Sequence, residues 1–410
     1  MAPPYGFSGR VLDEAGSPVS SVNVSLMRET YSSSGVRWLT AIPGARVSTN
    51  AIGEYRFAGI APGEYFVVAS PRSESSPFIN SFYPGVGSPE NATAIKALPG
   101  TREDHFDFSL VRGASYTVRV TAPPPAIVSS GVIPSFSLMP AGRGNLLTSF
   151  SVETMFESAG GNDYVSPRVP PGTYTLDVVW GTQNRIRVPL EIVDKNVDLG
   201  TVIPRQPLSI VGRFGPSGGG DVNFISLVNL DPETGAVSPP SRTRDGGFHW
   251  DWVPEGRYVI APTPSFQRQK GYIASVKLGG HEVTEDVFEL NEGSSKNLEI
   301  IVGGSGGTVN GVLEDSKGEG VSFGRVVFVP APERRGNPYL FLTTMADASG
   351  GFKLDGIPPG DYEVFGWDYV EENAYLNAAF LRKFDGRSIP VRIQARSTNS
   401  IFVNVIEAAK

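Results

Sequence analysis

The side chains best suited to bind a metal or to exchange protons near neutral pH are few and scattered in this sequence. The chain has three histidines and no cysteine in 410 residues. His105, His249 and His281 begin three unrelated stretches, His-Phe-Asp-Phe, His-Trp-Asp-Trp and His-Glu-Val-Thr. A catalytic zinc needs about three protein ligands at close spacing with one position left open. The sequence therefore predicts no metal site, no metal cofactor and no zinc hydrolase.

Other catalytic patterns are equally weak. Gly303-Gly-Ser-Gly-Gly307 resembles the Gly-x-Ser-x-Gly turn of serine hydrolases, but we expect it to join two strands, where it is better interpreted as a linker between two domains. Asp221, Asp231 and Asp245 lie in predicted turns without the alternating acidic pattern of a calcium loop, so only weak calcium binding stays open. The sequence predicts that the protein is not an enzyme. An unrecognised carboxylate site is the remaining enzymatic alternative.

Composition points to a folded chain of short strands and many turns. Gly 48 and Pro 34 accompany a hydrophobic fraction of 40%, too apolar for a disordered protein. A net charge of −7 argues against nucleic acid and anionic membranes as partners. Arg334-Arg335 and Arg382-Lys383 are interpreted as solvated charges. No apolar run reaches the roughly 18 residues of a membrane helix, so we expect no membrane insertion.

Four segments align without a gap and form the clearest pattern in the chain. Each opens with an aromatic residue and has Ile or Val five positions later, Gly eight positions later and Tyr ten positions later. The segments are Tyr55–Tyr65, Tyr164–Tyr174, Phe248–Tyr258 and Phe352–Tyr362. Their spacing of roughly a hundred residues matches a β-sandwich domain and exceeds solenoid repeats. The sequence predicts an all-β protein of four tandem Ig-like or prealbumin-like β-sandwich domains.

Each segment is expected to form a strand, a tight turn and a second strand. Alternating apolar residues mark the strands, and the turn glycine is expected at positive φ. The recurrent Tyr could offer a ligand platform, but its place in an alternating strand favours a buried ring whose hydroxyl bonds to nearby backbone, as in a tyrosine corner.

A second recurrent element is expected to be the first strand of each domain: Phe7–Val11, Tyr116–Val120, Ile210–Phe214 and Val309–Leu313. Asp13–Val19 and Asp315–Val321 then supply turn residues. The predicted domains are 1–112, 113–203, 204–303 and 304–410.

At these residues the chain resembles the carboxypeptidase regulatory-like family of prealbumin-like, or transthyretin-like, β-sandwich modules. The resemblance is strongest in the first and last domains, where the first strand, the Asp-x-x-Gly turn and Pro-Gly-x-Tyr occur in order. It implies tandem modules of a secreted or cell-surface bacterial protein. Such modules bind sugars, bind proteins or space other domains, and a shared fold does not choose among these roles.

Departures from the repeat mark the candidate binding residues. Trp252 occupies the position of Gly59 and Gly356, and an exposed Trp beside His249 and Asp251 could stack on a sugar or anchor a protein. Packing against a neighbouring domain is the alternative. Trp250, in contrast, is expected in the core.

Two insertions and one helix complete the expectations. The segment 28–45, with Tyr31 and Trp38, is predicted to be a long loop that carries recognition or, as the alternative, has a flexible serine-rich tip. The aromatic segment 77–85, with Tyr83, either covers a core edge or offers a contact patch. Residues 371–384 are predicted to form a short helix that stops at Gly386.

The leading hypothesis is a non-catalytic extracellular or cell-envelope protein that binds a polysaccharide or a protein partner, although residues 1–5 lack signal-peptide features. One alternative is a self-associating structural subunit, a surface fibre or scaffold, that offers a terminal strand such as Ser400–Val405 to a neighbour. Another is an accessory region of a larger enzyme or outer-membrane protein.

Overall fold

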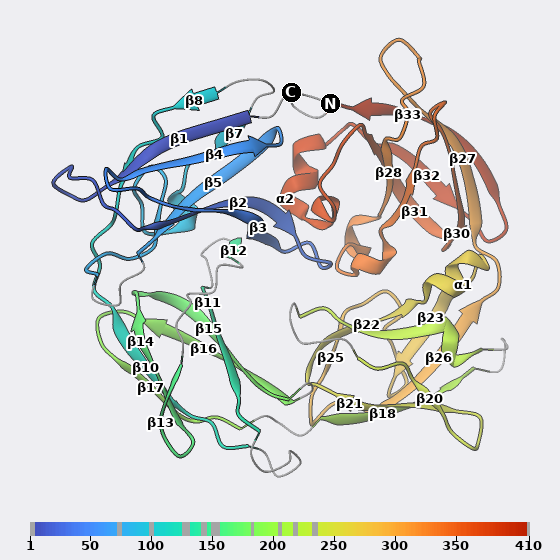
Figure 1. Cartoon of the computed structure of the whole chain (residues 1–410). Coiled ribbons are helices and arrows are strands. Elements are labelled where there is room, and N and C mark those ends of the chain that lie inside the picture. The colour runs from blue at the N-terminus through green and yellow to red at the C-terminus, as the bar shows by residue number, and fades with distance from the viewer. Residues whose placement is uncertain are drawn as a thin grey trace. The chain divides into compact units, whose positions relative to one another are not determined.

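The protein is all-β apart from short helical turns (Figure 1). The computed structural model describes residues 5–71, 76–97, 102–124, 132–140, 146–148, 156–181, 184–203, 207–215, 220–231 and 237–407. The chain divides into two compact units, Met1–Thr30 with Val36–Pro204, and Tyr31–Gly35 with Arg205–Lys410. Each unit contains two large buried clusters with the sheets around them, and we number these four sets modules 1 to 4. Their predicted boundaries at 112, 203 and 303 stay a prediction.

Module 1 surrounds a buried cluster drawn from Phe7 to Leu110. One sheet has the order β4-β1-β8, with β9 also paired to β1, and the other has the order β12-β3-β2-β5-β6, with β7 paired to β5. The elements are β1 (Tyr5–Leu12), β2 (Asn23–Tyr31), β3 (Arg37–Ser48), β4 (Glu54–Ile60), β5 (Gly63–Ser70), β6 (Ser81–Phe82), η1 (Pro89–Asn91), β7 (Ile95–Ala97), β8 (Arg102–Asp104), β9 (Phe108–Ser109) and β12 (Leu146–Thr148).

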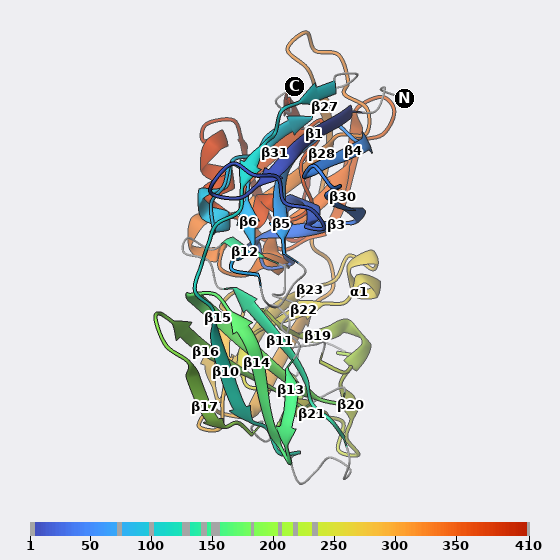
Figure 2. The same ribbon diagram turned by 60° about the vertical axis from the view of Figure 1, so that its left-hand side comes forward.

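Module 2 surrounds a cluster drawn from Val118 to Val202, between the sheets β13-β14-β10-β17 and β11-β15-β16. Figure 2 shows β10 beside β14 and β17, its neighbours in that order. The strands are β10 (Tyr116–Thr121), β11 (Ser135–Pro140), β13 (Glu157–Gly160), β14 (Asp163–Val169), β15 (Gly172–Trp180), β16 (Asn184–Ile192) and β17 (Val197–Thr201).

Module 3 surrounds a cluster drawn from Leu208 to Ile300, between the sheets β20-β21-β18-β26-β23-β24 and β19-β22-β25. Its elements are β18 (Leu208–Phe214), η2 (Val222–Phe224), β19 (Ile225–Asn229), β20 (Ser241–Arg242), β21 (Phe248–Val253), β22 (Gly256–Pro262), α1 (Pro264–Arg268), β23 (Tyr272–Leu278), β24 (His281–Glu282), β25 (Phe288–Leu290) and β26 (Asn297–Gly303). The five-residue helix α1 was not predicted; Thr263 caps it and Pro264 opens it, as at other helix starts.

Module 4 is one continuous sheet, β29-β28-β31-β33-β27-β30 with β32 on β31, folded over a cluster drawn from Val309 to Val405. The elements are β27 (Gly307–Glu314), β28 (Arg325–Pro330), η3 (Pro332–Arg334), η4 (Pro338–Leu340), β29 (Leu342–Met345), β30 (Gly351–Ile357), β31 (Gly360–Trp367), η5 (Ala374–Leu376), α2 (Ala378–Leu381), η6 (Arg382–Phe384), β32 (Ile389–Ile393) and β33 (Thr398–Ile406).

The predicted short helix of module 4 is confirmed, although α2 is only four residues long and is flanked by 3₁₀ turns. It covers the outer face of the sheet, where Phe380 and Phe384 pack against the buried cluster of Phe365 and Trp367. This second buried layer explains why β28 is apolar on both faces. Gly386 follows at φ 78°, as expected for a stop.

All four modules share one strand plan. The first strand pairs antiparallel with the first strand of the aromatic-Gly-Tyr segment, as β1 with β4, β10 with β14, β18 with β21 and β27 with β30. On its other side it pairs in parallel with the last strand or strands of the same module, as β1 with β8 and β9, β10 with β17, β18 with β26 and β27 with β33. The two strands of each segment are not paired neighbours.

The turn and tyrosine of the repeated segment behave as predicted. Gly63, Gly172, Gly256 and Gly360 have φ between 151° and 159°, which a residue with a Cβ rarely adopts. Two residues later, each tyrosine ring is buried and its hydroxyl donates to the carbonyl four residues earlier. These bonds are Tyr65 to Ala61 (2.8 Å), Tyr174 to Pro170 (2.9 Å), Tyr258 to Pro254 (2.6 Å) and Tyr362 to Pro358 (3.0 Å).

The predicted long loop 28–45 is wrong, because its residues form most of a β-hairpin. β2 ends at Tyr31 and β3 begins at Arg37, and the two strands are neighbours. Thr30 and Thr40 share a hydroxyl hydrogen bond of 2.7 Å across them. Thr, Val and aromatic residues favour strands, and this preference outweighs the serine-rich tip.

Ser400–Val405 lies in β33, which stands between β27 and β31 in the strand order and is not the outermost strand of its sheet. It pairs with β27 through Asn404, whereas β31 pairs with β33 only at Val405 and Ile406. Self-association through this segment stays a prediction. None of the helices in the described part of the chain has the length and apolar character needed to cross a bilayer.

Candidate functional site

Trp252 sits where the first strand pair of each module is interrupted. In modules 1, 3 and 4 an extra residue is inserted opposite the first strand, and it is Gly59, Trp252 or Gly356. All three have left-handed φ values, 76°, 62° and 74°. Glycine adopts this conformation without strain, whereas Trp does so at a cost of about 1–2 kcal/mol. Trp252 is also 45% exposed, so the indole keeps part of its surface free for contact.

His249 and Asp251 lie on the outer face of β21 beside it, while Trp250 points into the core and is buried as expected. The His249 Nε2 atom is 3.1 Å from Asp251 Oδ2, and the other carboxylate oxygen accepts from Ser209 Oγ at 3.1 Å. The three candidate residues of module 3 therefore share an exposed surface. They form a contact patch of one Trp, one His and one carboxylate.

The other three candidates lie outside module 3, and each is partly buried. Tyr31 packs edge-on against Phe380 at 6.1 Å between ring centroids. Trp38 lies in β3, and its Nε1 atom is buried without a hydrogen-bond partner in the described residues. Tyr83 packs against Phe106 and Phe108 at the border of the module 1 core, so segment 77–85 covers a core edge.

The residues considered for metals have structural partners. Asp221 caps η2 and pairs with Arg242 at 2.8 Å, and Asp231 pairs with Arg257 at 2.8 Å. Hydrogen bonds, first from the Thr243 side chain, lower the pKa of Asp245. In the described part of the chain, no three His, Asp or Glu side chains gather closely enough to hold a metal ion.

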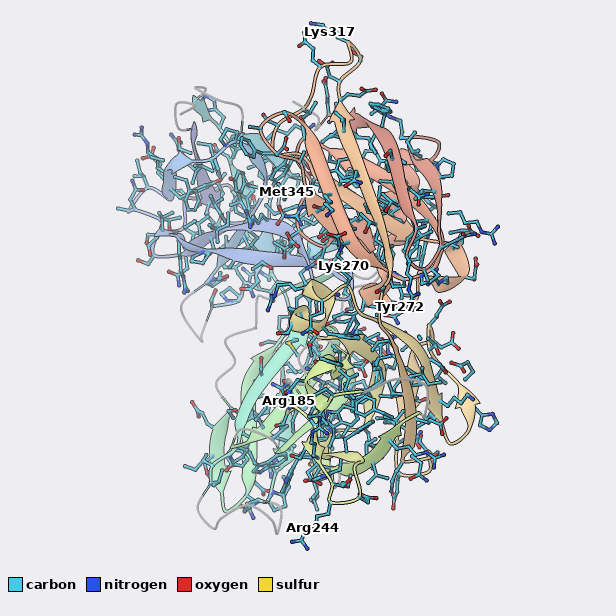
Figure 3. The ribbon with its side chains drawn as sticks, turned by 90° about the vertical axis from the view of Figure 1, so that its right-hand side faces the viewer. Arg185, Arg244, Lys270, Tyr272, Lys317 and Met345 are labelled. Carbon is cyan, nitrogen blue, oxygen red and sulfur yellow. The ribbon has the colours of Figure 1, made fainter. Side chains whose placement is uncertain are left out.

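Sequence reasoning missed a cavity between modules 3 and 4, within the second unit. Its volume is about 250 Å³, and both modules line it. Lys270 and Tyr272, labelled in Figure 3, lie at this junction. The lining residue Arg334 is only 8% exposed, so the interpretation of Arg334-Arg335 as solvated charges is wrong for Arg334. The η3 turn that follows β28 carries it inward.

Two ion pairs cross this junction. Arg334 Nη2 lies 2.7 Å from Glu285 Oε1, and Lys270 Nζ lies 3.1 Å from Asp355 Oδ1. The Thr308 hydroxyl, which donates to Asp355 at 2.7 Å, is the main cause that lowers the pKa of Asp355 to about 2. Asp355 therefore stays ionised, and its pairing with Lys270 holds over the neutral pH range.

The glycine-rich stretch 303–307, which the sequence analysis interprets as a joint, is packed between modules 3 and 4. The Gly306 N–H donates to the Lys270 carbonyl at 2.9 Å, and both Gly306 and Gly307 are buried. A Cβ at Gly306 would lie 2.5 Å from the Gly356 backbone. These glycines allow two backbones to approach closely. A glycine-rich composition is compatible with either close packing or flexibility, so it could not distinguish the two.

Comparison with known proteins gives a distant sequence relative. No family model matches the chain, so the resemblance to the carboxypeptidase regulatory-like family stays a prediction. Colossin-A of Dictyostelium discoideum is 22% identical over 355 residues, which cover 82% of this chain and 3% of colossin-A. The chain thus spans a very small part of the curated relative that it matches.

Among solved structures, the chain aligns at low similarity with two pilus proteins and with a third bacterial protein. The major pilin subunit BcpA of Bacillus cereus is 12% identical, with 98% of this chain and 99% of that chain covered and a TM-score of 0.17. The RrgB pilus protein of Streptococcus pneumoniae is 8% identical, with 100% and 99% covered and a TM-score of 0.18. The Bacillus anthracis TIE protein is 8% identical, with 98% and 74% covered and a TM-score of 0.18. Scores this low carry no argument about function.

Proposed function

We propose that this chain is a non-catalytic structural segment of an extracellular or cell-surface protein, in which each module resists tension applied along the chain. The observation that carries the proposal is the parallel pairing of the first strand with the last strand or strands in every module. The proposal follows the structural alternative of the sequence analysis more closely than its leading hypothesis of a binding protein.

Parallel pairing determines how a pulling force reaches the hydrogen bonds. In a parallel pair, the start of the first strand and the end of the last strand lie at opposite ends of the pair. A force that separates these two points slides the strands past each other and loads all the intervening hydrogen bonds together. An antiparallel terminal pair would instead be opened one bond at a time. The first geometry requires a larger force, because several bonds must break in one event.

Module 4 has the longest such pairing, with seven matched positions from Thr308–Thr398 to Glu314–Asn404. In module 3 the pairing runs from Val211–Asn297 to Phe214–Ile300. The packed junction between the two modules also supports the proposal. Its ion pairs and the hydrogen bond from Gly306 to Lys270 connect module 3 to module 4.

The titratable groups also have structural explanations. Burial raises the pKa values of Tyr55, Tyr174, Tyr258 and Tyr362, all of which donate hydrogen bonds to backbone carbonyls. Backbone N–H donors lower the pKa of the turn residue Asp315, and hydrogen bonds from the Ser349 side chain and then from backbone N–H groups lower the pKa of Asp347. Membership of the carboxypeptidase regulatory-like family and a surface location are part of the proposal. The far greater length of colossin-A is compatible with a repeated segment of a larger protein.

Single-molecule pulling on module 4 tests the proposal. The chain lacks cysteine, so two introduced cysteines give unique handles. Gly304→Cys with Glu407→Cys applies shear across β27 and β33. Gly304→Cys with Thr398→Cys grips the same end of both strands and peels them apart. All three positions are exposed, and a Cβ at Gly304 meets no atom within 4 Å.

We expect the shear handles to need about twice the rupture force of the peeling handles or more, since the seven positions yield together. Equal forces in the two geometries would contradict a role in resisting tension.

A second candidate function is partner binding at the surface of Trp252, His249 and Asp251. The observation that favours it is that Trp252 has a strained backbone and is exposed, since strain of this kind occurs often at functional positions. Pull-down with the full chain and its Trp252→Gly variant tests it. Loss of a specific partner in the variant supports binding, and an identical set of captured proteins contradicts it.

A further inference from the structure

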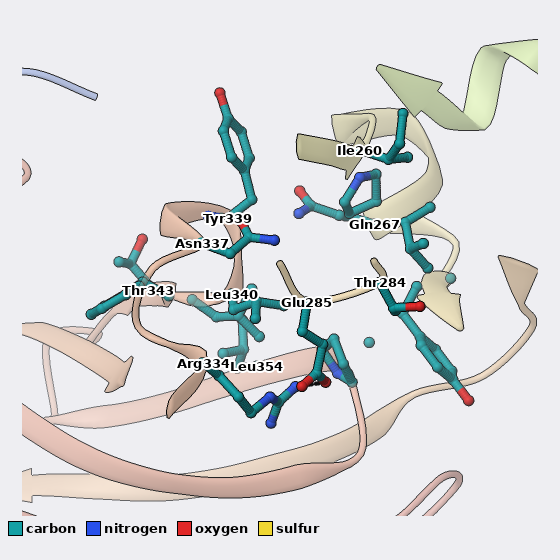
Figure 4. A pocket seen from close by; sticks show the side chains of 18 of the residues that line it. Ile260, Gln267, Thr284, Glu285, Arg334, Asn337, Tyr339, Leu340, Thr343 and Leu354 are labelled. Atoms are coloured by element: carbon teal, nitrogen blue, oxygen red, sulfur yellow. Dashed lines mark hydrogen bonds and ion pairs between the residues drawn. The ribbon is translucent and has the colours of Figure 1, made fainter. Parts of the chain in front are cut away.

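The cavity between modules 3 and 4 is large enough for a small ligand. Its volume of about 250 Å³ corresponds to about eight water molecules at the liquid density, which is also room for one sugar ring. Figure 4 shows it between the α1 region of module 3 and the η3 and η4 turns of module 4. The sequence predictions did not identify this cavity.

Two deeply buried polar side chains line this cavity. Arg334 is 8% exposed, and its Nε atom has no hydrogen-bond partner in the described part of the chain. Asn337 is 2% exposed, and its Oδ1 atom accepts from the Tyr339 N–H at 3.0 Å, which leaves the amide group as a donor. Gln267 and Thr284 add an amide and a hydroxyl from module 3. Buried polar groups need partners, which a ligand or water can supply.

The charges in the cavity wall favour an uncharged ligand. Arg334 pairs with Glu285 at 2.7 Å, and Asp355 pairs with Lys270 and with Lys353, each at 3.1 Å. A bound anion would lie near the carboxylates of Glu285 and Asp355, which repel it. A bound cation would lie near Arg334 and Lys270, which repel it. Either ligand would have to displace an existing pair and leave a desolvated charge without its partner.

Apolar side chains also line the cavity, among them Ile260, Leu340 and Leu354. A sugar ring suits this combination, because each hydroxyl both donates and accepts while the C–H groups of the ring pack on aliphatic side chains. We propose that the cavity between modules 3 and 4 binds one uncharged sugar ring, as a free monosaccharide or as the end of a glycan.

This inference does not depend on the role in tension. The force experiment probes the β27 and β33 pairing, and sugar binding is measured without force, so either proposal can fail while the other stands. A bound sugar would lie at the junction between modules 3 and 4.

Saturation-transfer NMR on the full chain tests the site. The neutral probes are glucose, galactose, mannose and N-acetylglucosamine, each also as its methyl glycoside, and the charged probes are glucuronate and glucosamine. Gln267→Ala removes an amide from the cavity wall. Gln269→Ala is the matched control, because Gln269 is exposed two residues later and does not line the cavity.

We expect saturable binding of at least one neutral probe, a dissociation constant raised about tenfold by Gln267→Ala, and no change with Gln269→Ala. Binding of methyl glycosides would identify a glycan end, and binding of free sugars alone would identify a monosaccharide. The site is refuted by a panel that gives no saturable signal, by tighter binding of a charged probe, or by equal weakening in both variants.

Discussion

The backbone of Trp252 adopts the same left-handed conformation as Gly59 and Gly356, although only glycine does so without strain. The common cause is the extra residue that each of these positions inserts into the first strand pair. The position is thus defined by backbone geometry, and the side chain is the variable part. This is why an exposed indole at this point is a candidate for contact with a partner.

The two glycines allow a test of conformation against packing. A Cβ at Gly59 meets no atom within 4 Å, so Gly59→Ala should lower the free energy of unfolding by about 1 kcal/mol through φ alone. Gly356→Ala should cost more, because its Cβ would lie 2.9 Å from Lys270 Cα. Urea unfolding of the two variants measures the difference. Equal losses would show that the junction at Lys270 is loosely packed.

The tyrosine hydroxyls provide a second prediction at this scale. Tyr174→Phe removes the 2.9 Å bond to the Pro170 carbonyl and should lower the free energy of unfolding by about 1 kcal/mol. Tyr116→Phe is the control in the same module, because no bond of the Tyr116 hydroxyl occurs in the described residues. Thermal and urea unfolding compare them. If both variants lose the same stability, the hydroxyl bond contributes nothing.

The pH dependence of stability follows from the same burial. Burial raises the pKa of Tyr362 to about 12, whereas an unfolded tyrosine ionises near about 10. Above pH 10 the unfolded chain loses this proton while the folded chain retains it, so folding stability falls as pH rises from about 10 to about 12. Tyr362→Phe should flatten the decline between those values. An unchanged slope would contradict the assignment.

At the scale of elements, the junction of modules 3 and 4 depends on the η3 turn. Sequence reasoning could predict the strands and the turn glycines there, because alternation and Pro-Gly pairs are local signals. It could not predict that Arg334 faces inward while Arg335 pairs with Glu363 at the surface. Two adjacent arginines give no local signal of burial, and the partner Glu285 lies 49 residues away in the chain.

The two arginines therefore differ in their expected contributions. Arg334→Met should lower the free energy of unfolding of the second unit by about 2 kcal/mol, because it leaves Glu285 unpaired and removes the guanidinium from the Tyr362 ring. Arg335→Met should cost less than about 1 kcal/mol, since its pair with Glu363 is more exposed. Denaturant titration followed by Trp fluorescence distinguishes them, and a larger loss for Arg335→Met would contradict the account.

In the hairpin at 28–45, a local sequence signal was present but was not used. Length and serine content favoured a loop, although Thr30, Val36 and Thr40 are residues that favour strands. A prediction based on β-strand propensity would have found β2 and β3.

The parallel partner of each first strand could not be predicted for a different reason. That pairing joins residues about 90 positions apart in sequence, so no local pattern indicates it.

For the whole chain, four repeats of one segment were enough to predict an all-β protein of sandwich modules. The repeat could not predict which strand pairs with the first strand of each module, or how modules 3 and 4 pack against each other. The two proposals rest on these two features. The first and last strands of each module are side by side and parallel, and modules 3 and 4 meet through buried glycines and ion pairs.

The most direct test of the central claim is to pull the intact chain from its two ends and record force against extension. We expect separate rupture events, with the last and strongest from module 4, which releases about 100 residues and therefore about 340 Å of chain. Each rupture should occur at a higher force than the rupture of module 4 when it is pulled through Gly304→Cys and Thr398→Cys. Gradual lengthening at or below the peeling force would contradict a structural role under tension.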